Sequence, residues 1–103
     1  MRTIDHFIGG SSFASGERQG DVFNPSEGQV QATVRLGTAA DLQRAVDAAK
    51  AAQPAWAATN PQRRARVMFR FKELIEQNMD DLARILSSEH GKVIADAKGD
   101  IQR

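Results

Sequence analysis

The hydrophobic pattern changes its period at Gly37, and this change constrains the fold more than any other feature of the sequence. From Gln29 to Leu36, apolar and polar residues alternate strictly, as in a half-buried strand. After Gly37, apolar residues recur at the three- and four-residue spacing of a helix face. We therefore expect short strands and turns over residues 1–37 and helices over residues 38–103. The alternation predicts that one strand face carries Val30, Ala32, Val34 and Leu36.

Turn residues divide the first region into short pieces. Gly9-Gly10 follows the apolar piece His6–Ile8, and glycine tolerates the positive φ angles of a tight turn. Asn24–Gly28 reads Asn-Pro-Ser-Glu-Gly, in which asparagine opens a turn, proline fixes φ and glycine closes it. These signals predict short N-terminal strands that include a hairpin.

Capping and breaking residues predict four helices in the second region. Thr38 and Asp41 resemble a capping box at the start of the first helix. Pro54 is expected to end that helix, with Trp56 in the connection that follows. The remaining boundaries are predicted at Asn60-Pro61, at the break over Asn78–Asp80, at Gly91 and near Ile94.

The predicted core is light for a chain of this length. Of the 42 hydrophobic residues 16 are alanine, and only 22 of the 103 residues are Leu, Ile, Val or Phe. Alanine buries little area to offset an ordering cost of roughly 1–2 kcal/mol per residue. The last helix also reaches Arg103 without a capping glycine, a proline or a polar tail. We therefore expect a fragment whose apolar faces pack against a part that the chain does not contain.

Composition excludes several classes of protein. Cysteine is absent, which excludes a disulfide framework, a cysteine-ligated zinc and a thiol nucleophile within this chain. A net charge of +1 gives the chain no strong long-range electrostatic attraction to nucleic acid or to anionic lipid. No apolar run approaches the roughly 18 residues of a membrane span, and the N-terminus lacks the apolar stretch of a secretory signal. The default expectation is a soluble, cytoplasmic globular segment without a nucleic-acid or membrane partner.

A basic run lies in the second predicted helix. Such a run could contact phosphates, but a solvated face or pairing with acids elsewhere explains it without a partner. No aromatic residue is interleaved on the basic face, which disfavours nucleic-acid binding. The run consists of Arg63, Arg64, Arg66, Arg70 and Lys72, with no acid before Glu73.

The other candidates for chemistry are two histidines and a pair of acids. His6 has no metal-ligand partner at helical spacing, and His90 is placed to complement a helix dipole just before Gly91. Asp96 and Asp100 share a helix face and could act as acid and base, or could simply be solvated. Glycine-rich phosphate-binding patterns are absent. The residues alone therefore indicate an α+β segment without a visible active site.

Six segments follow one another in a specific order. They are Phe7-Ile8-Gly9-Gly10, Val22–Gly28, Asp41–Ala49, Trp56, Arg63–Arg66 and Ser88–Lys92. In this order they resemble the N-terminal part of an aldehyde dehydrogenase, and the resemblance runs from about His6 to Arg103. Within that family, the stretches most similar to the CoA-acylating methylmalonate-semialdehyde dehydrogenases are Pro61–Phe71, Glu89–Lys92 and Ala97–Arg103.

The resemblance implies an α/β fold and a much longer parent protein. Residues 1–103 would supply the outer strands and first helices of a Rossmann-like NAD-binding domain. The parent would be a homo-oligomer that uses NAD and coenzyme A to convert methylmalonate semialdehyde, and malonate semialdehyde, to an acyl-CoA in valine- or inositol-type catabolism. Its cysteine nucleophile, NAD loops and oligomerisation strands would lie elsewhere. We therefore expect no catalytic residue and no cofactor site in this segment, which would be inactive alone.

The resemblance also implies two sites. Several family members bind a structural monovalent cation through backbone carbonyls before the Asn-Pro turn and a carboxylate after the Gly-Lys pair, which here would be Val22, Phe23 and Asp100. An oxygen-rich site of this kind suits a hard cation. Arg103 would bind the substrate carboxylate in the parent enzyme, because a guanidinium fork matches a carboxylate bidentately. Alternatively, Arg103 is a surface arginine or a partner of Asp100.

A second hypothesis comes from a different class of protein. The chain would be a stand-alone interaction module, or one that contacts RNA, through the helix face over Arg63–Arg70. The DNA downstream of Arg103 discriminates the two hypotheses. A reading frame that continues into a cysteine-bearing dehydrogenase favours the enzyme, and a genuine stop codon favours the module.

Overall fold

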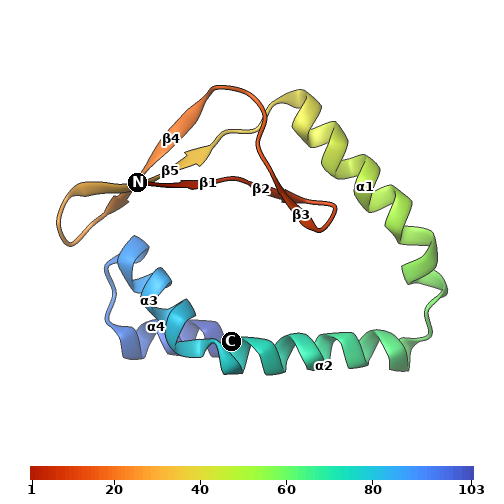
Figure 1. Ribbon diagram of the computed structural model, residues 1–103. Coiled ribbons are helices and arrows are strands. Elements are labelled where there is room, and N and C mark those ends of the chain that lie inside the picture. The colour runs from red at the N-terminus through yellow and green to blue at the C-terminus, as the bar shows by residue number, and fades with distance from the viewer. The chain divides into compact units, whose positions relative to one another are not determined.

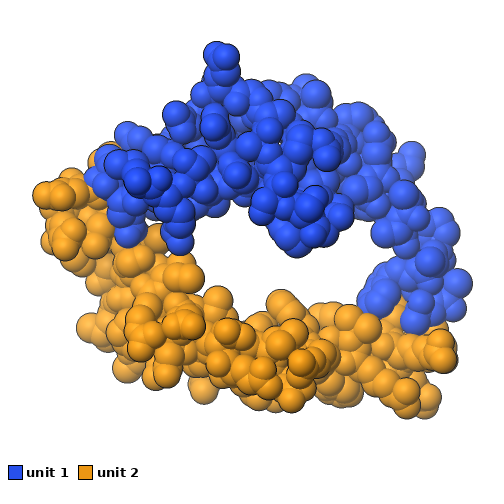
Figure 2. Space-filling model, viewed as in Figure 1, with its two compact units in different colours: residues 1–22, 30–59 blue, residues 23–29, 60–103 orange.

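Five short strands precede four helices, as the change of period predicts (Figure 1). The computed structural model describes all 103 residues. The chain divides into two units, one of residues 1–22 and 30–59 and the other of residues 23–29 and 60–103 (Figure 2). The strands are β1 (Arg2–Ile4), β2 (His6–Ile8), β3 (Ser11–Phe13), β4 (Gln19–Asn24) and β5 (Gln29–Arg35), and the helices are α1 (Ala39–Ala58), α2 (Pro61–Gln77), α3 (Met79–His90) and α4 (Ile94–Gln102).

The strands form two small sheets. In the three-stranded sheet the order is β1-β5-β4, and β1 runs parallel to β5 with Arg2 opposite Ala32 and Ile4 opposite Val34. The second sheet is the antiparallel pair of β2 and β3. Its turn is Gly9-Gly10, whose φ angles of 62° and 84° are favourable only for glycine. The predicted hairpin is therefore confirmed.

Strand β5 ends at Arg35, one residue before the predicted alternation ends at Leu36. Ala32 is buried as expected, but Leu36 lies beyond the strand and is 39 % exposed. Its backbone N–H still donates to the carbonyl of Arg18 at 3.1 Å. A Cβ added to Gly20 would lie 3.6 Å from the Val34 side chain and 3.8 Å from the Leu36 side chain, so these two residues lie on the same face, as the alternation predicts.

Helix α1 begins where the sequence predicts. The Thr38 hydroxyl oxygen accepts from the Asp41 N–H at 3.1 Å, and an Asp41 carboxylate oxygen accepts from the Thr38 N–H at 2.9 Å. These two bonds satisfy backbone donors that the first helical turn would otherwise leave free. The capping box is therefore confirmed with aspartate in place of glutamate.

The predicted end of α1 at Pro54 is wrong. The helix continues through Pro54 to Ala58, so Trp56 lies within α1 and not in a connection. An internal proline removes one backbone bond and costs roughly 3 kcal/mol. Alanine, the best helix former, flanks it on both sides and favours continuation. The last turn is also closed by Thr59, whose N–H and hydroxyl both donate to the carbonyl of Ala55.

The other helix boundaries agree with the sequence. The Asn60 side chain accepts from the Arg63 N–H at 2.9 Å and caps α2, and Asn78 separates α2 from α3. Gly91 ends α3 with φ at 88°, and its N–H donates to the carbonyl of Ser87 at 2.8 Å. None of the four helices is both long and apolar enough to cross a bilayer.

The fully buried apolar residues are all alanine. They are Ala32 in β5, Ala83 in α3 and Ala97 in α4. Helix α2 has no buried residue, although it carries an apolar stripe. Large apolar side chains on that helix are about half exposed or more: Val67, Met68, Phe69 and Phe71. The small hydrophobic core expected from composition is therefore confirmed.

These exposed apolar faces predict that the isolated 103-residue chain associates with itself and unfolds without a sharp transition. Apolar patches of this extent promote association in water. Light scattering on a size-exclusion column should report species larger than 11.3 kDa, and thermal unfolding should be broad. A monomer with a cooperative melt would contradict the prediction.

A second prediction concerns Gly91. A Cβ added there would lie 3.0 Å from the Pro25 side chain, and the backbone is left-handed. We expect Gly91→Ala to destabilise the corner between α3 and α4 by roughly 1–2 kcal/mol from the backbone alone. Amide hydrogen exchange at this corner should measure the loss.

Gly99→Ala is the matched control, because Gly99 is helical and a Cβ there meets nothing within 4 Å. This variant should be more stable by roughly 0.5–1 kcal/mol, since alanine replaces glycine within a helix. Equal effects of the two substitutions would refute the argument.

Candidate functional site

Arg103, the predicted substrate ligand, lies at the end of α4. Its guanidinium Nη1 is 3.4 Å from Oδ1 of Asp100, one turn earlier, and its backbone N–H donates to the Asp100 carbonyl. The side chain is 82 % exposed. The alternative of pairing with Asp100 is therefore observed, and the exposed guanidinium still has donors for a further anion. Binding of a substrate carboxylate stays a prediction.

Asp100 is the centre of a charged cluster on the same helix. Lys92 Nζ pairs with Asp100 Oδ2 and lies 3.2 Å from Asp96 Oδ2. The Lys92 hydrogen bond, with smaller contributions from nearby positive charges, lowers the pKa of Asp100. Conversely, hydrogen bonds to Asp100 and Asp96 raise the pKa of Lys92.

The predicted acid pair is thus brought together, but around a lysine. Asp96 and Asp100 both face Lys92, as their four-residue spacing allows. A general acid needs a raised pKa near the working pH, whereas the pKa of Asp100 is lowered. The geometry therefore favours an ion-pair cluster over acid–base chemistry.

The predicted cation ligands come from different parts of the chain. Val22 and Phe23 are neighbours in β4, and Asp100 lies in α4. Val22 belongs to one unit and the other two residues to the second unit. No group of three or more His, Cys, Asp or Glu side chains is placed to hold a metal ion. The cation site through backbone carbonyls stays a prediction.

The basic run on α2 is partly neutralised within the helix. Arg70 lies 2.8 Å from Glu73, and Lys72 lies 3.0 Å from Glu76, at spacings of three and four residues. These are exposed pairs of the kind that solvates a helix surface. The structure therefore gives no support to the nucleic-acid interpretation of this face.

An apolar hollow lies beside Arg103. It has a volume of about 320 Å³ and is bounded by α2, the start of α3 and the end of α4. Its apolar walls come from α2, from the first residue of α3 and from the end of α4. The lining includes Met68, Phe71, Ile75, Met79 and Ile101, with Arg103 at the same hollow.

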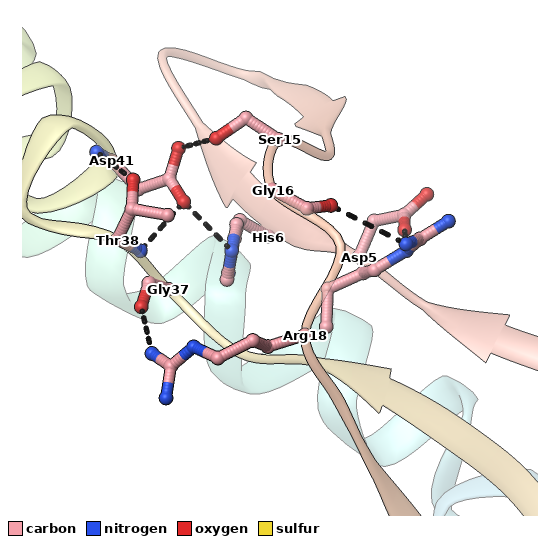
Figure 3. Close-up of polar contacts among 9 residues, drawn as sticks. Asp5, His6, Ser15, Gly16, Arg18, Gly37, Thr38 and Asp41 are labelled. Atoms are coloured by element: carbon pink, nitrogen blue, oxygen red, sulfur yellow. Dashed lines mark hydrogen bonds and ion pairs between the residues drawn. The ribbon is translucent and has the colours of Figure 1, made fainter.

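A polar network around Asp41 was not visible in the sequence (Figure 3). Asp41 is 5 % exposed, and its carboxylate accepts from the Ser15 hydroxyl and from the Thr38 N–H. His6 Nε2 lies 3.6 Å from the same carboxylate. The Ser15 hydrogen bond, followed by that of the Thr38 backbone, lowers the pKa of Asp41. The capping box signals Asp41, but no sequence signal links it to Ser15, 26 residues earlier.

The network contains the three residue types of a serine hydrolase in an unproductive order. In a catalytic triad, histidine stands between serine and aspartate and takes the serine proton. Here Asp41 stands between Ser15 and His6, so Ser15 donates directly to the carboxylate. The network therefore fixes the start of α1 and does not activate a nucleophile. Arg18 adds to it by donating to the Gly37 carbonyl at 3.1 Å.

The same network determines which backbone N–H groups are free at the start of α1. A helix N-terminus after a strand binds pyrophosphate through free backbone N–H groups. At α1 the Asp41 carboxylate already accepts from the Thr38 N–H and adds a negative charge. The Asp41 carboxylate therefore disfavours an anion such as pyrophosphate at the turn between β5 and α1.

A comparison with protein families decides the relationship of this chain. The model of the aldehyde dehydrogenase family matches residues 13–103. The chain belongs to the aldehyde dehydrogenase family. The resemblance drawn from the ordered motifs is thus confirmed, and the strands and helices correspond to the N-terminal part of the NAD-binding fold of this family.

Three relatives illustrate the similarity. A malonate-semialdehyde dehydrogenase of Pseudomonas aeruginosa is 47 % identical over 100 % of this chain and 21 % of its own length. The acylating methylmalonate-semialdehyde/malonate-semialdehyde dehydrogenase of rat mitochondria is 38 % identical over 98 % of the chain and 19 % of its own. A Sinorhizobium meliloti structure with NAD, assigned as a methylmalonate-semialdehyde dehydrogenase, is 57 % identical with a TM-score of 0.98 over 100 % of the chain and 21 % of its own.

The chain therefore spans about a fifth of the length of these aldehyde dehydrogenases. This aldehyde dehydrogenase segment contains no cysteine.

The Asp41 network generates a pH prediction. The pKa of Asp41 is lowered in the folded chain, so the ionised carboxylate stabilises α1 at pH values above 3.8, the ordinary pKa of aspartate. This stabilisation is lost as the pH falls through the lowered pKa. We expect the helical signal in circular dichroism to fall below about pH 4. Asp41→Asn should have a weaker helical signal at neutral pH than the wild type and should lose less of it on acidification.

Part of the acid loss should remain in the variant, because lysine hydrogen bonds also lower the pKa values of Asp80 and Asp100. The matched control is Asp47→Asn on the same helix, where the carboxylate accepts from Gln43 on the exposed surface. It should keep the wild-type helical signal at neutral pH. Identical behaviour of the two variants would contradict the role given to Asp41.

Proposed function

We propose that this chain is the N-terminal part of an NAD-dependent, CoA-acylating dehydrogenase of malonate and methylmalonate semialdehyde. The observation that carries the proposal is the match over the whole chain to the NAD-bound Sinorhizobium meliloti structure, at 57 % identity. The acylating reaction in the name of the rat relative supports thioester release to coenzyme A. Residues 1–103 form part of the cofactor-binding domain. The exposed apolar faces of their helices pack against the remaining polypeptide.

The chemistry itself needs residues outside this segment. A covalent route for aldehyde oxidation requires an activated thiolate, and the segment has no cysteine. The 103-residue chain alone should therefore form no NADH from an aldehyde, NAD and coenzyme A. These residues supply part of the domain framework and, at the end of α4, the positive charge of Arg103.

Arg103 is the residue we assign to the substrate. Malonate semialdehyde, named for the relatives, carries a carboxylate that a simple aldehyde lacks. The Arg103 guanidinium is exposed while one of its nitrogens is tethered to Asp100 at 3.4 Å. A tethered guanidinium loses less freedom when it binds an anion and presents its planar donors in a fixed direction.

The test is Arg103→Ala in the full-length polypeptide that carries this segment. Loss of a desolvated charged contact costs roughly 2–5 kcal/mol, so NADH formation with malonate semialdehyde should fall at least about 30-fold. Activity with propanal, which has no carboxylate, should change little. Arg103→Lys should restore only part of the difference, because an ammonium cannot bind bidentately.

Arg84→Ala is the matched control for this test. Arg84 is also an exposed arginine that pairs with an aspartate three residues earlier, at 3.0 Å from Asp81. It should leave the ratio of the two activities unchanged. Equal losses on both substrates for Arg103→Ala would mean a structural role, and no loss on either would refute the assignment.

A further inference from the structure

Both carboxylate oxygens of Asp100 are already engaged by positive groups. Lys92 Nζ contacts Oδ2, and Arg103 Nη1 lies 3.4 Å from Oδ1. Family resemblance had assigned this carboxylate to a monovalent cation. The donor set at Asp100 is therefore different from the open, oxygen-only arrangement that a hard cation requires.

Lys92 is held in this position by the backbone and by burial. It follows the left-handed Gly91, and its carbonyl accepts from the Ser87 hydroxyl at 2.6 Å. Its side chain is 15 % exposed, whereas Asp96 is 60 % and Asp100 38 % exposed. The ammonium is thus the most covered charge of the cluster, and a covered ammonium needs anionic partners.

A second cation at Asp100 would face this ammonium at short range. Like charges a few ångströms apart repel strongly where water is partly excluded. A bound ion would also have to displace Lys92 from Asp100, which would leave the partly covered ammonium with Asp96 alone. The residues at Asp100 therefore do not fit a monovalent cation.

We propose that the ammonium of Lys92 takes the place of the monovalent cation at Asp100. Lys92 thus acts as an internal counter-ion that links the corner after α3 to Asp96 and Asp100 on α4. The inference concerns binding and local stability, and it does not depend on the proposed reaction.

The experiment compares the full-length polypeptide that carries this segment in sodium, potassium and choline chloride at equal ionic strength, with amide hydrogen exchange of residues 87–103 as the readout. Equal ionic strength removes general screening, so a difference between the salts reports specific binding. We expect no difference in the wild-type chain. Lys92→Met should exchange at least about tenfold faster at this corner, because two carboxylates lose their shared partner.

Two further variants keep the test decisive. Lys92→Arg retains the charge and should protect the corner like the wild type, even if Lys92→Met unfolds it. Lys98→Met removes another charge of α4, which pairs with Asp80 at 2.8 Å, and should leave the exchange of Ser87–Lys92 unchanged. The proposal is overturned if sodium or potassium protects the wild-type corner and Asp100→Asn abolishes that protection. It is also overturned if Lys92→Met leaves the exchange unchanged.

Discussion

Alanine is the only residue type that this chain buries completely, at Ala32, Ala83 and Ala97. A core of three methyl groups provides little of the burial that normally offsets chain entropy. The helices therefore leave their apolar faces exposed in this segment, which spans about a fifth of the length of its aldehyde dehydrogenase relatives. Within the segment itself, order depends mainly on local hydrogen bonds at the ends of each element.

This dependence on local bonds explains why so much of the fold could be predicted. The capping box of Thr38, the Asn60 cap and the left-handed Gly91 each involve residues within four positions of one another, so the sequence displays them directly. Pro54 misled the prediction because its local cost competes with good helix formers around it and with the closing bonds of Thr59. The exposure of Leu36 was not predicted, because periodicity cannot tell where a chain leaves its sheet.

In the charged clusters, too, contacts between residues close in sequence could be predicted and contacts between distant residues could not. The shared face of Asp96 and Asp100 follows from helical spacing, but Lys92 reaches them across the corner after Gly91 and completes the cluster. The bond from Ser15 to Asp41 spans 26 residues and has no local signal at all. Predictions at Arg103 came from family resemblance, since a single exposed arginine has no pattern of its own. Long-range polar contacts are thus what the sequence could not supply.

The parallel pairing of β1 with β5 has a practical consequence for handling this polypeptide. Residues 2–4 hydrogen-bond beside residues 32–34, so the amino-terminal residues are an edge strand of the sheet that leads into α1. Affinity tags or purification handles fused directly before Met1 would continue from that strand, and proteolytic trimming of a few residues would remove one side of β5. A handle at this terminus needs a flexible spacer, because the first residues of this chain are part of its architecture.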